Sequence, residues 1–161
     1  MDYIAAPWRF AYVSSADAVT DCIFCAAVGG GRDTLTVAEG ESVIAMLNKY
    51  PYTSGHTMVA PKLHTGEFEA LAPATLQEMM AMCQRVVRAL RRLYRPHAFN
   101  IGFNLGESAG AGVADHLHLH VVPRWRGDTS FMTTLAQTRV LPETLDTTWE
   151  RLSAALRGDG E

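Results

Sequence analysis

Three of the six histidines of this chain occupy alternate positions, at His116, His118 and His120. Side chains at alternate positions of an extended strand point to the same face. We therefore expect the three imidazoles to form one polar ladder, with Leu117 and Leu119 facing the opposite way into a core. Imidazole can act as acid, base, nucleophile or metal ligand near neutral pH. The spacing predicts a reactive site on this strand.

A glycine-rich loop precedes the ladder and could hold an anion beside it. Residues 106–112 read Gly-Glu-Ser-Ala-Gly-Ala-Gly, which places Gly110 and Gly112 shortly before His116. Small residues let backbone N–H groups approach a phosphate closely. Such loops are common without a ligand, so the informative feature here is the position next to three imidazoles. His56 adds a fourth imidazole that could reach the same face.

Cys22 and Cys25 form a C-x-x-C pair, and two thiolates at this spacing can share one zinc ion. Structural zinc takes four ligands, and His64 and His116 could complete the tetrahedron. Such a site would be closed, and hence structural rather than catalytic. From spacing alone, a pair of buried or redox-active cysteines is an equal alternative. His97 lies away from these motifs, and we expect it to be exposed or to cap a helix.

Apolar runs predict the strands that must position these groups. They cover residues 34–38, 42–48, 56–62, 98–104 and 117–123, and Pro, Ser and Gly between the second and third suit a loop. Between the strand groups, apolar side chains recur at helical spacing at Leu76, Met79, Met80, Cys83, Val86, Val87, Leu90 and Leu93.

The ends of two helices are also indicated. Thr75 and Glu78 fit a capping box at the start of the long helix, and Pro96 ends it. A second helix follows Pro142 and stops near Gly158, with one apolar face formed by Leu145, Trp149, Leu152 and Leu156. These elements predict an α+β fold, in which a long helix and a C-terminal helix pack on an antiparallel sheet.

Composition excludes several classes of protein. The 161 residues, 48% of them apolar, suit one globular domain spanning 1–161. A net charge of −3 argues against nucleic-acid binding. No apolar run reaches the length of about 20 residues that spans a membrane, and residues 1–9 lack the pattern of a signal peptide. Three cysteines, an odd number, favour a reducing, cytoplasmic location.

The ordered motifs resemble one family. His-x-His-x-His followed by Val121 and Val122 is similar to the signature of the histidine triad (HIT) superfamily. The resemblance implies a HIT-like fold with a core at about 22–125 and a C-terminal helical extension at about 126–161. The resemblance to the superfamily also includes residues 22–25, 55–64 and 104–106. Residues 6–9, 97–100, 123–125 and 127–128 look like the branch of bacterial diadenosine tetraphosphate phosphorylases and hydrolases.

The resemblance implies a role for each matching residue. His118 takes the place of the nucleophile that attacks the α-phosphorus of a nucleotide. His56 and His120 match histidines that polarise the phosphate and orient the nucleophile. A zinc site is implied at Cys22, Cys25, His64 and His116. Nucleotide binding is implied at Ile23 and Phe24 beside the base, Asn48 at the ribose, and Asn104 near the phosphates.

The function implied is cleavage of a dinucleoside polyphosphate, such as diadenosine tetraphosphate, by a hydrolase or phosphorylase that passes through a nucleotidyl-histidine. Two alternatives remain: an adenosine phosphoramidase, and a zinc-stabilised module that binds purine nucleotides with little turnover. The resemblance also implies a homodimer, and leaves open whether magnesium accompanies the polyphosphate.

One departure from the family concerns the leaving group. Many HIT hydrolases have a serine or threonine a few residues before the first triad histidine, where its hydroxyl assists departure. Residues 111–115 are Ala-Gly-Val-Ala-Asp and contain no hydroxyl, and Ser108 is the nearest. The acceptor of the nucleotidyl group therefore stays open from the sequence.

Overall fold

The computed structural model describes residues 22–128 and 142–158. Its centre is a five-stranded sheet in the order β1-β2-β3-β5-β4, in which every neighbouring pair is antiparallel. This confirms the predicted α+β fold, and each strand lies within a few residues of its predicted run. The motif at residues 6–9 lies outside the described residues. The strands are β1 (Thr36–Glu39), β2 (Val43–Leu47), β3 (Thr57–Pro61), β4 (Ala98–Phe103) and β5 (Leu119–Arg124).

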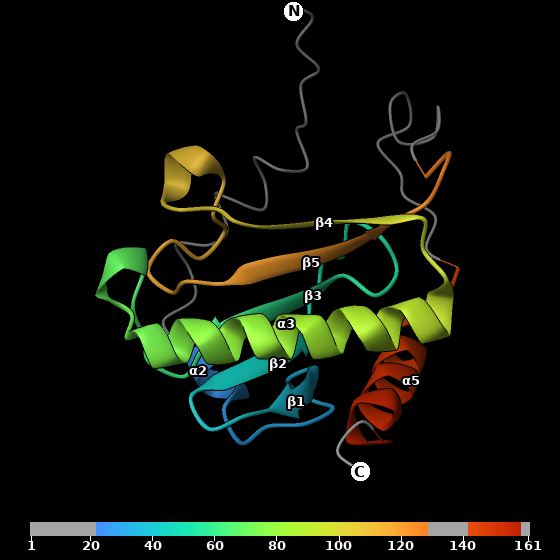
Figure 1. Cartoon of the computed structure of the whole chain (residues 1–161), viewed down its shortest axis with the longest axis horizontal. Coiled ribbons are helices and arrows are strands. Elements are labelled where there is room, and N and C mark those ends of the chain that lie inside the picture. The colour runs from blue at the N-terminus through green and yellow to red at the C-terminus, as the bar shows by residue number, and fades with distance from the viewer. Residues whose placement is uncertain (1–21, 129–141, 159–161) are drawn as a thin grey trace, which may run out of the picture.

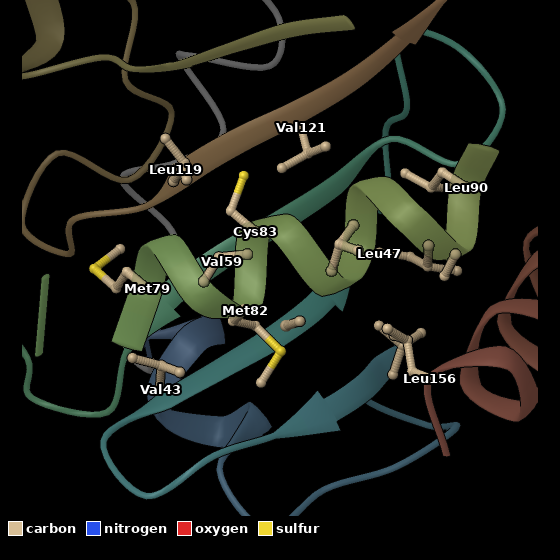
Figure 2. Close-up of a cluster of buried hydrophobic side chains, with 14 of the residues drawn as sticks. Val43, Leu47, Val59, Met79, Met82, Cys83, Leu90, Leu119, Val121 and Leu156 are labelled. Carbon is tan, nitrogen blue, oxygen red and sulfur yellow. The ribbon is translucent and has the colours of Figure 1, made fainter. Parts of the chain in front are cut away.

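The long helix α3 (Pro73–Tyr94) lies across one face of this sheet (Figure 1). Its buried side chains meet those of the central strands, as Figure 2 shows for Met79, Cys83 and Leu90. The inclusion of Met80 in the predicted apolar stripe was wrong, because this side chain is 44% exposed. Met82 and Ala89 are buried in its place, since a stripe that follows 3.6 residues per turn passes through 79, 82, 83, 86, 89 and 90.

The predicted capping box at the start of α3 is also wrong. The helix begins at Pro73, and Ala72 at the N-cap provides no side-chain hydrogen bond. Proline suits the first helical position because its missing N–H would have no partner there, and this start places Thr75 inside the first turn. Glu78 instead accepts hydrogen bonds from the backbone N–H groups of Glu41 at 2.7 Å and Ser42 at 2.9 Å. Its carboxylate thus ties the β1–β2 turn to the helix.

The C-terminal helix α5 (Leu145–Arg157) packs beside α3 and β1 (Figure 1). Thr144 caps it by accepting a hydrogen bond from the Thr147 N–H, and Gly158 follows it as predicted. Leu152 and Leu156 enter the core, and the Trp149 indole N–H donates to the Thr36 carbonyl of β1 at 2.7 Å.

The opposite face of the sheet is covered in part by the short helix α2 (Ile23–Ala27). Phe24 and Ala27 of α2 pack against side chains of β2 and β3, namely Ile44, Met46, Met58 and Ala60. Two 3-10 turns, η2 (Phe68–Ala70) and η3 (Glu107–Ala109), lie in the loops. Within the described ranges, no helix combines the length and apolarity needed to cross a membrane.

Candidate active site

The histidine ladder lies at the start of β5, on the face that α2 partly covers. The strand itself begins at Leu119, so His116 and His118 lie just before it and His120 lies within it. Leu117 and Leu119 enter the core under α3, as predicted. The rings of His118 and His120 are neighbours, with centroids 4.9 Å apart.

The hydrogen bonding of His118 leaves one nitrogen available for attack. Its Nδ1 lies 2.8 Å from the carbonyl oxygen of His116. A carbonyl only accepts hydrogen bonds, so Nδ1 carries the proton and Nε2 carries the lone pair. Burial lowers the pKa of His118 below its ordinary value, which favours the neutral ring. The Phe24 ring stacks on it with centroids 4.8 Å apart and limits its rotation.

A chain of hydrogen bonds determines the tautomer of His120. The backbone N–H of Tyr52 donates to His56 Nδ1 at 3.1 Å. His56 Nε2 therefore carries the proton and donates it to His120 Nδ1 at 3.0 Å. His120 must then carry its own proton on Nε2. Burial, and then the neighbouring His118, lower the pKa of His120 to about 4, so this ring is a neutral N–H donor beside His118.

Two further side chains, both in the loop after β2, contact this hydrogen-bond relay, which runs from Tyr52 through His56 to His120. Asn48 is buried, with its amide nitrogen 3.4 Å from His56 Nδ1, and its Oδ1 accepts from the Tyr50 N–H at 2.9 Å. The Tyr52 ring lies against His56, with centroids 4.6 Å apart, and faces His120 at 6.2 Å. Sequence reasoning missed Tyr52; the available signal was an aromatic residue in the loop four positions before His56.

The four residues of the candidate metal centre meet in one cluster. One ligand atom from each of Cys22, Cys25, His64 and His116 lies within 4.8 Å of all the others. Cys22 Sγ is 3.1 Å from His116 Nδ1, and Cys25 Sγ is 3.3 Å from His64 Nδ1. Two sulfurs and two imidazole nitrogens at this spacing suit a tetrahedral zinc ion. The three cysteines of the described residues are free of disulfides.

The orientation of His116 also fits a metal ligand. Its Nε2 lies 2.8 Å from the carbonyl oxygen of Pro61, so Nε2 carries the proton and the Nδ1 lone pair faces the two sulfurs. Burial lowers the pKa of His116, which favours the neutral form that can bind a cation. A backbone carbonyl that orients a ligating imidazole is a recurrent feature of zinc sites.

The glycine-rich loop is ordered by its own backbone. Gly110 has a φ of 93°, and its N–H donates to the Glu107 carbonyl at 2.8 Å. That amide is turned into the loop, and the part of Gly110 in phosphate binding stays a prediction, as does that of Gly112. Ser108 is exposed on η3.

The remaining predicted positions have different surroundings. Ile23 is 40% exposed at the start of α2, whereas Phe24 is buried against the triad. Asn104 follows β4 and lines a cleft beside His120. The roles of these residues and of Asn48 in nucleotide binding stay predictions. His97 is exposed and accepts from the Arg126 N–H at 3.0 Å, as expected for a histidine outside the site.

The cleft beside His120 has a volume of about 420 Å³. Gly102 and Asn100 of β4 contribute to its floor, and Tyr52, Arg124 and Asp128 also line it. Arg124 lies in the family-like segment 123–125, but sequence reasoning gave neither it nor Gly102 a part in the site. The missing information was the strand register, which places Gly102 opposite His120.

Comparisons with known proteins agree with this arrangement. The family model of the HIT domain matches residues 31–127. An AP-4-A phosphorylase of Mycobacterium tuberculosis is 47% identical over 114 residues, which are 71% of this chain and 58% of that protein. An uncharacterized HIT-like protein of the same species is 38% identical over 107 residues, covering 66% of this chain and 74% of the relative.

A solved structure also matches the fold. The crystal structure of a Zn-bound histidine triad family protein from Mycobacterium smegmatis has a TM-score of 0.68 and 35% identity. The match covers 86% of this chain and 94% of that protein. The chain has three histidines before and within β5, a sheet packed under α3 and a matched HIT domain. It therefore belongs to the histidine triad (HIT) family.

Proposed function

We propose that this protein cleaves dinucleoside polyphosphates such as diadenosine tetraphosphate through a nucleotidyl group carried on His118. The observation that carries the proposal is the pair of tautomers in the triad. His118 holds a lone pair on Nε2, and the neighbouring His120 holds an N–H that can donate to a phosphoryl oxygen. A nucleophile and a donor for the developing charge are the two groups that this transfer needs.

The first step would transfer the nucleotidyl group to the protein. His118 Nε2 attacks the α-phosphorus, the N–P bond forms, and the P–O bond to the rest of the polyphosphate breaks. The electron pair of that bond leaves with the departing oxygen. The imidazole becomes positively charged, and the His116 carbonyl at 2.8 Å from Nδ1 stabilises this charge.

The second step would release the nucleotide. Water or inorganic phosphate attacks the same phosphorus, the N–P bond breaks, and its electron pair returns to Nε2 of His118. The proton of the attacking water passes to solvent. Attack by water would yield AMP and ATP from diadenosine tetraphosphate, and attack by phosphate would yield ADP and ATP.

The choice of substrate rests on two supports. The first is the similarity to an AP-4-A phosphorylase, although this chain spans only 58% of that protein. The second is the lack of a hydroxyl at residues 111–115. A polyphosphate leaves as a stable anion and needs little proton donation, whereas the amine released from a phosphoramidate must be protonated. The missing hydroxyl therefore favours the phosphoanhydride over the phosphoramidate.

We propose in addition that zinc occupies the Cys22, Cys25, His64 and His116 cluster. The donor set and the orientation of His116 support this ion, as does the Zn-bound relative. When bound, zinc would supply structural cross-linking, because four protein ligands leave no open position for a substrate. It would hold α2 against the ends of β3 and the start of β5, two residues from His118. Magnesium on the polyphosphate stays a prediction.

We also propose that two copies of the chain associate through β4. This strand is an edge of the sheet, and an unprotected edge can pair with another strand. Apolar side chains lie exposed on it and nearby, with Ile101 at 49% and Leu105 at 50%. Pairing between two copies would cover them.

Product analysis tests the proposed function. Diadenosine tetraphosphate is incubated with the wild type or with His118→Ala, each with and without inorganic phosphate. We expect AMP and ATP, or ADP and ATP only when phosphate is present, and no product from His118→Ala. Equal turnover by the two proteins would contradict the role of His118, and no turnover by the wild type would contradict the proposed substrate.

A further inference from the structure

The cleft beside His120 has no part in the chemistry on His118 described above. Its volume of about 420 Å³ lies within the range of small-molecule sites. β4 and β5 form its floor, and Tyr52 and Thr53 from the loop after β2 also line it. It opens next to the donor that we expect to face the substrate phosphate, so a substrate that extends beyond that phosphate can enter it.

Gly102 keeps the floor of this cleft open. It pairs in register with His120, so the two positions face the same side of the sheet. A methyl group at Gly102 would meet no heavy atom within 4 Å, and its φ lies outside the left-handed region. Neither the backbone nor the packing therefore requires glycine, although glycine weakens a strand interior. Its effect is to leave space beside His120.

The cleft and the predicted site of the retained nucleoside lie on opposite sides of the triad. Asn48 directly follows β2, and Phe24 belongs to α2, which packs on β2 and β3. Gly102 belongs to β4, and β5 lies between β3 and β4 in the sheet. In a phosphoryl transfer, the attacking and departing atoms lie roughly in line across the phosphorus. A substrate with a nucleoside at each end would therefore extend from β2 across His118 and His120 toward β4.

The groups at one end of the cleft suit a nucleoside better than a bare anion. Arg124 donates to both carboxylate oxygens of Asp128, at 2.6 and 2.8 Å, and to the Asn100 amide oxygen at 2.7 Å. Asp128 offsets the charge of the guanidinium. Amide groups and the Tyr52 ring offer hydrogen bonds and an apolar surface, which are what a base and ribose require.

We infer that this cleft holds the departing nucleoside polyphosphate, and that Gly102 is the residue that admits it. The inference rests on the proposed function, since it assigns a place to the leaving group of that reaction. It extends that function, because the space beside Gly102 on β4 would determine how large a leaving group the site accepts.

Substitutions that fill the space at Gly102 test the inference. Gly102→Val and Gly102→Ala are compared with the wild type on two substrates, diadenosine tetraphosphate and adenosine 5′-phosphoramidate, whose leaving groups are large and very small. We expect Gly102→Val to lower the ratio of the two kcat/KM values, dinucleotide over phosphoramidate, by at least tenfold. Gly102→Ala should give an intermediate ratio. Ala98→Val adds bulk to the same face of β4 outside the cleft and should leave the ratio within twofold.

A binding measurement keeps the test independent of turnover. On a His118→Asn background, Gly102→Val should weaken diadenosine tetraphosphate at least tenfold and AMP less than twofold, by calorimetry. If both ligands weaken equally, or neither changes, the inference is wrong while the proposed function stands. If the wild type neither turns over nor binds any of these nucleotides, the proposed function fails as well. Size-exclusion chromatography of each variant checks that the assembly state is unchanged.

Discussion

At the scale of single residues, the reactive groups are defined by which nitrogen carries each proton. Three backbone groups determine this: the carbonyls of His116 and Pro61 and the N–H of Tyr52. Each imposes one tautomer on a buried histidine. The triad thus needs no charged partner to make His118 nucleophilic, and its neutral state follows from burial.

The relay from His56 to His120 predicts a catalytic defect when the first ring loses its nitrogens. His56→Phe keeps the ring against Tyr52 but removes the N–H that donates to His120. We expect kcat to fall about tenfold or more, since a lost hydrogen bond of about 1.4 kcal/mol corresponds to tenfold. His97→Phe, at an exposed histidine outside the site, should leave kcat unchanged. Equal effects of the two substitutions would contradict the relay.

The lowered pKa of His120 predicts an acid-sensitive fold. Between its ordinary pKa of 6.5 and about 4, the unfolded chain binds more protons than the folded protein, so the free energy of unfolding decreases as the pH falls through that window. The groups facing His120 are His118, His56 and the Tyr52 ring. His120→Asn should reduce this decrease by about 2 kcal/mol.

Urea unfolding at pH 7 and pH 4.5 measures that difference. A chelator is included in all samples so that metal release does not contribute. If the wild type and His120→Asn lose the same stability between the two pH values, the neutral state of His120 in the folded protein is not supported.

At the scale of elements, the metal cluster joins α2, the loop after β3 and the start of β5. Cys22→Ser/Cys25→Ser should abolish zinc binding and lower Tm by about 5–10 °C. Losing the metal should cost a few kcal/mol of stability, and each kcal/mol shifts the Tm of a domain of this size by about 2–4 °C. Chelation should lower the Tm of the wild type and of Cys83→Ala, whose buried cysteine lies outside the cluster. Zinc content by atomic absorption and thermal melts provide the readouts. A double variant with full zinc and unchanged Tm would refute the site.

The start of α3 gives a second prediction at this scale. Glu78→Gln weakens two charge-assisted hydrogen bonds to the β1–β2 turn and should cost about 1 kcal/mol in the free energy of unfolding. Thr75→Ala should change it by less than about 0.5 kcal/mol, because Thr75 does not cap the helix. Denaturant titrations compare the two. A larger loss of stability for Thr75→Ala than for Glu78→Gln would contradict this assignment and support the capping box.

How far the sequence could predict these elements depends on the range of the interactions involved. Apolar runs located every strand to within a few residues, because the central strands are buried along their whole length, as β2 and β3 are. The partner of Glu78 could not be predicted, since residues 41 and 42 are brought to it only by packing. Gly102 is similar: it has no local signal, and only its register with His120 reveals what its missing side chain leaves open.

At the scale of the whole molecule, one face of the sheet carries the hydrophobic core under α3, and the other carries α2 with its smaller apolar cluster and the histidine triad. The two roles alternate along β5, where Leu119 and Val121 face α3 and His120 faces away. The sheet order places β2, the triad and β4 in sequence across that face. A long substrate could therefore lie across the strands, and the exposed edge at β4 stays available to a second copy.

The proposed association through β4 predicts a change in mass on disrupting that edge. Ile101→Lys should convert a dimer into a monomer in size-exclusion chromatography with light scattering, because lysine on an edge strand opposes pairing. Val28→Lys places the same charge at an exposed apolar residue beyond α2 and should leave the dimer intact. A wild-type protein that runs as a monomer would contradict the association.

The most direct test of the central claim is the mass of the protein during turnover. Wild-type protein is mixed with diadenosine tetraphosphate, quenched in alkali, where a phosphorus–nitrogen bond to histidine survives, and measured by intact mass spectrometry. We expect a population heavier by one adenylyl group, mapped to His118 by peptide fragmentation and missing from His118→Ala. Turnover with no adduct under rapid quenching, or an adduct on another residue, would show that His118 is not the nucleophile.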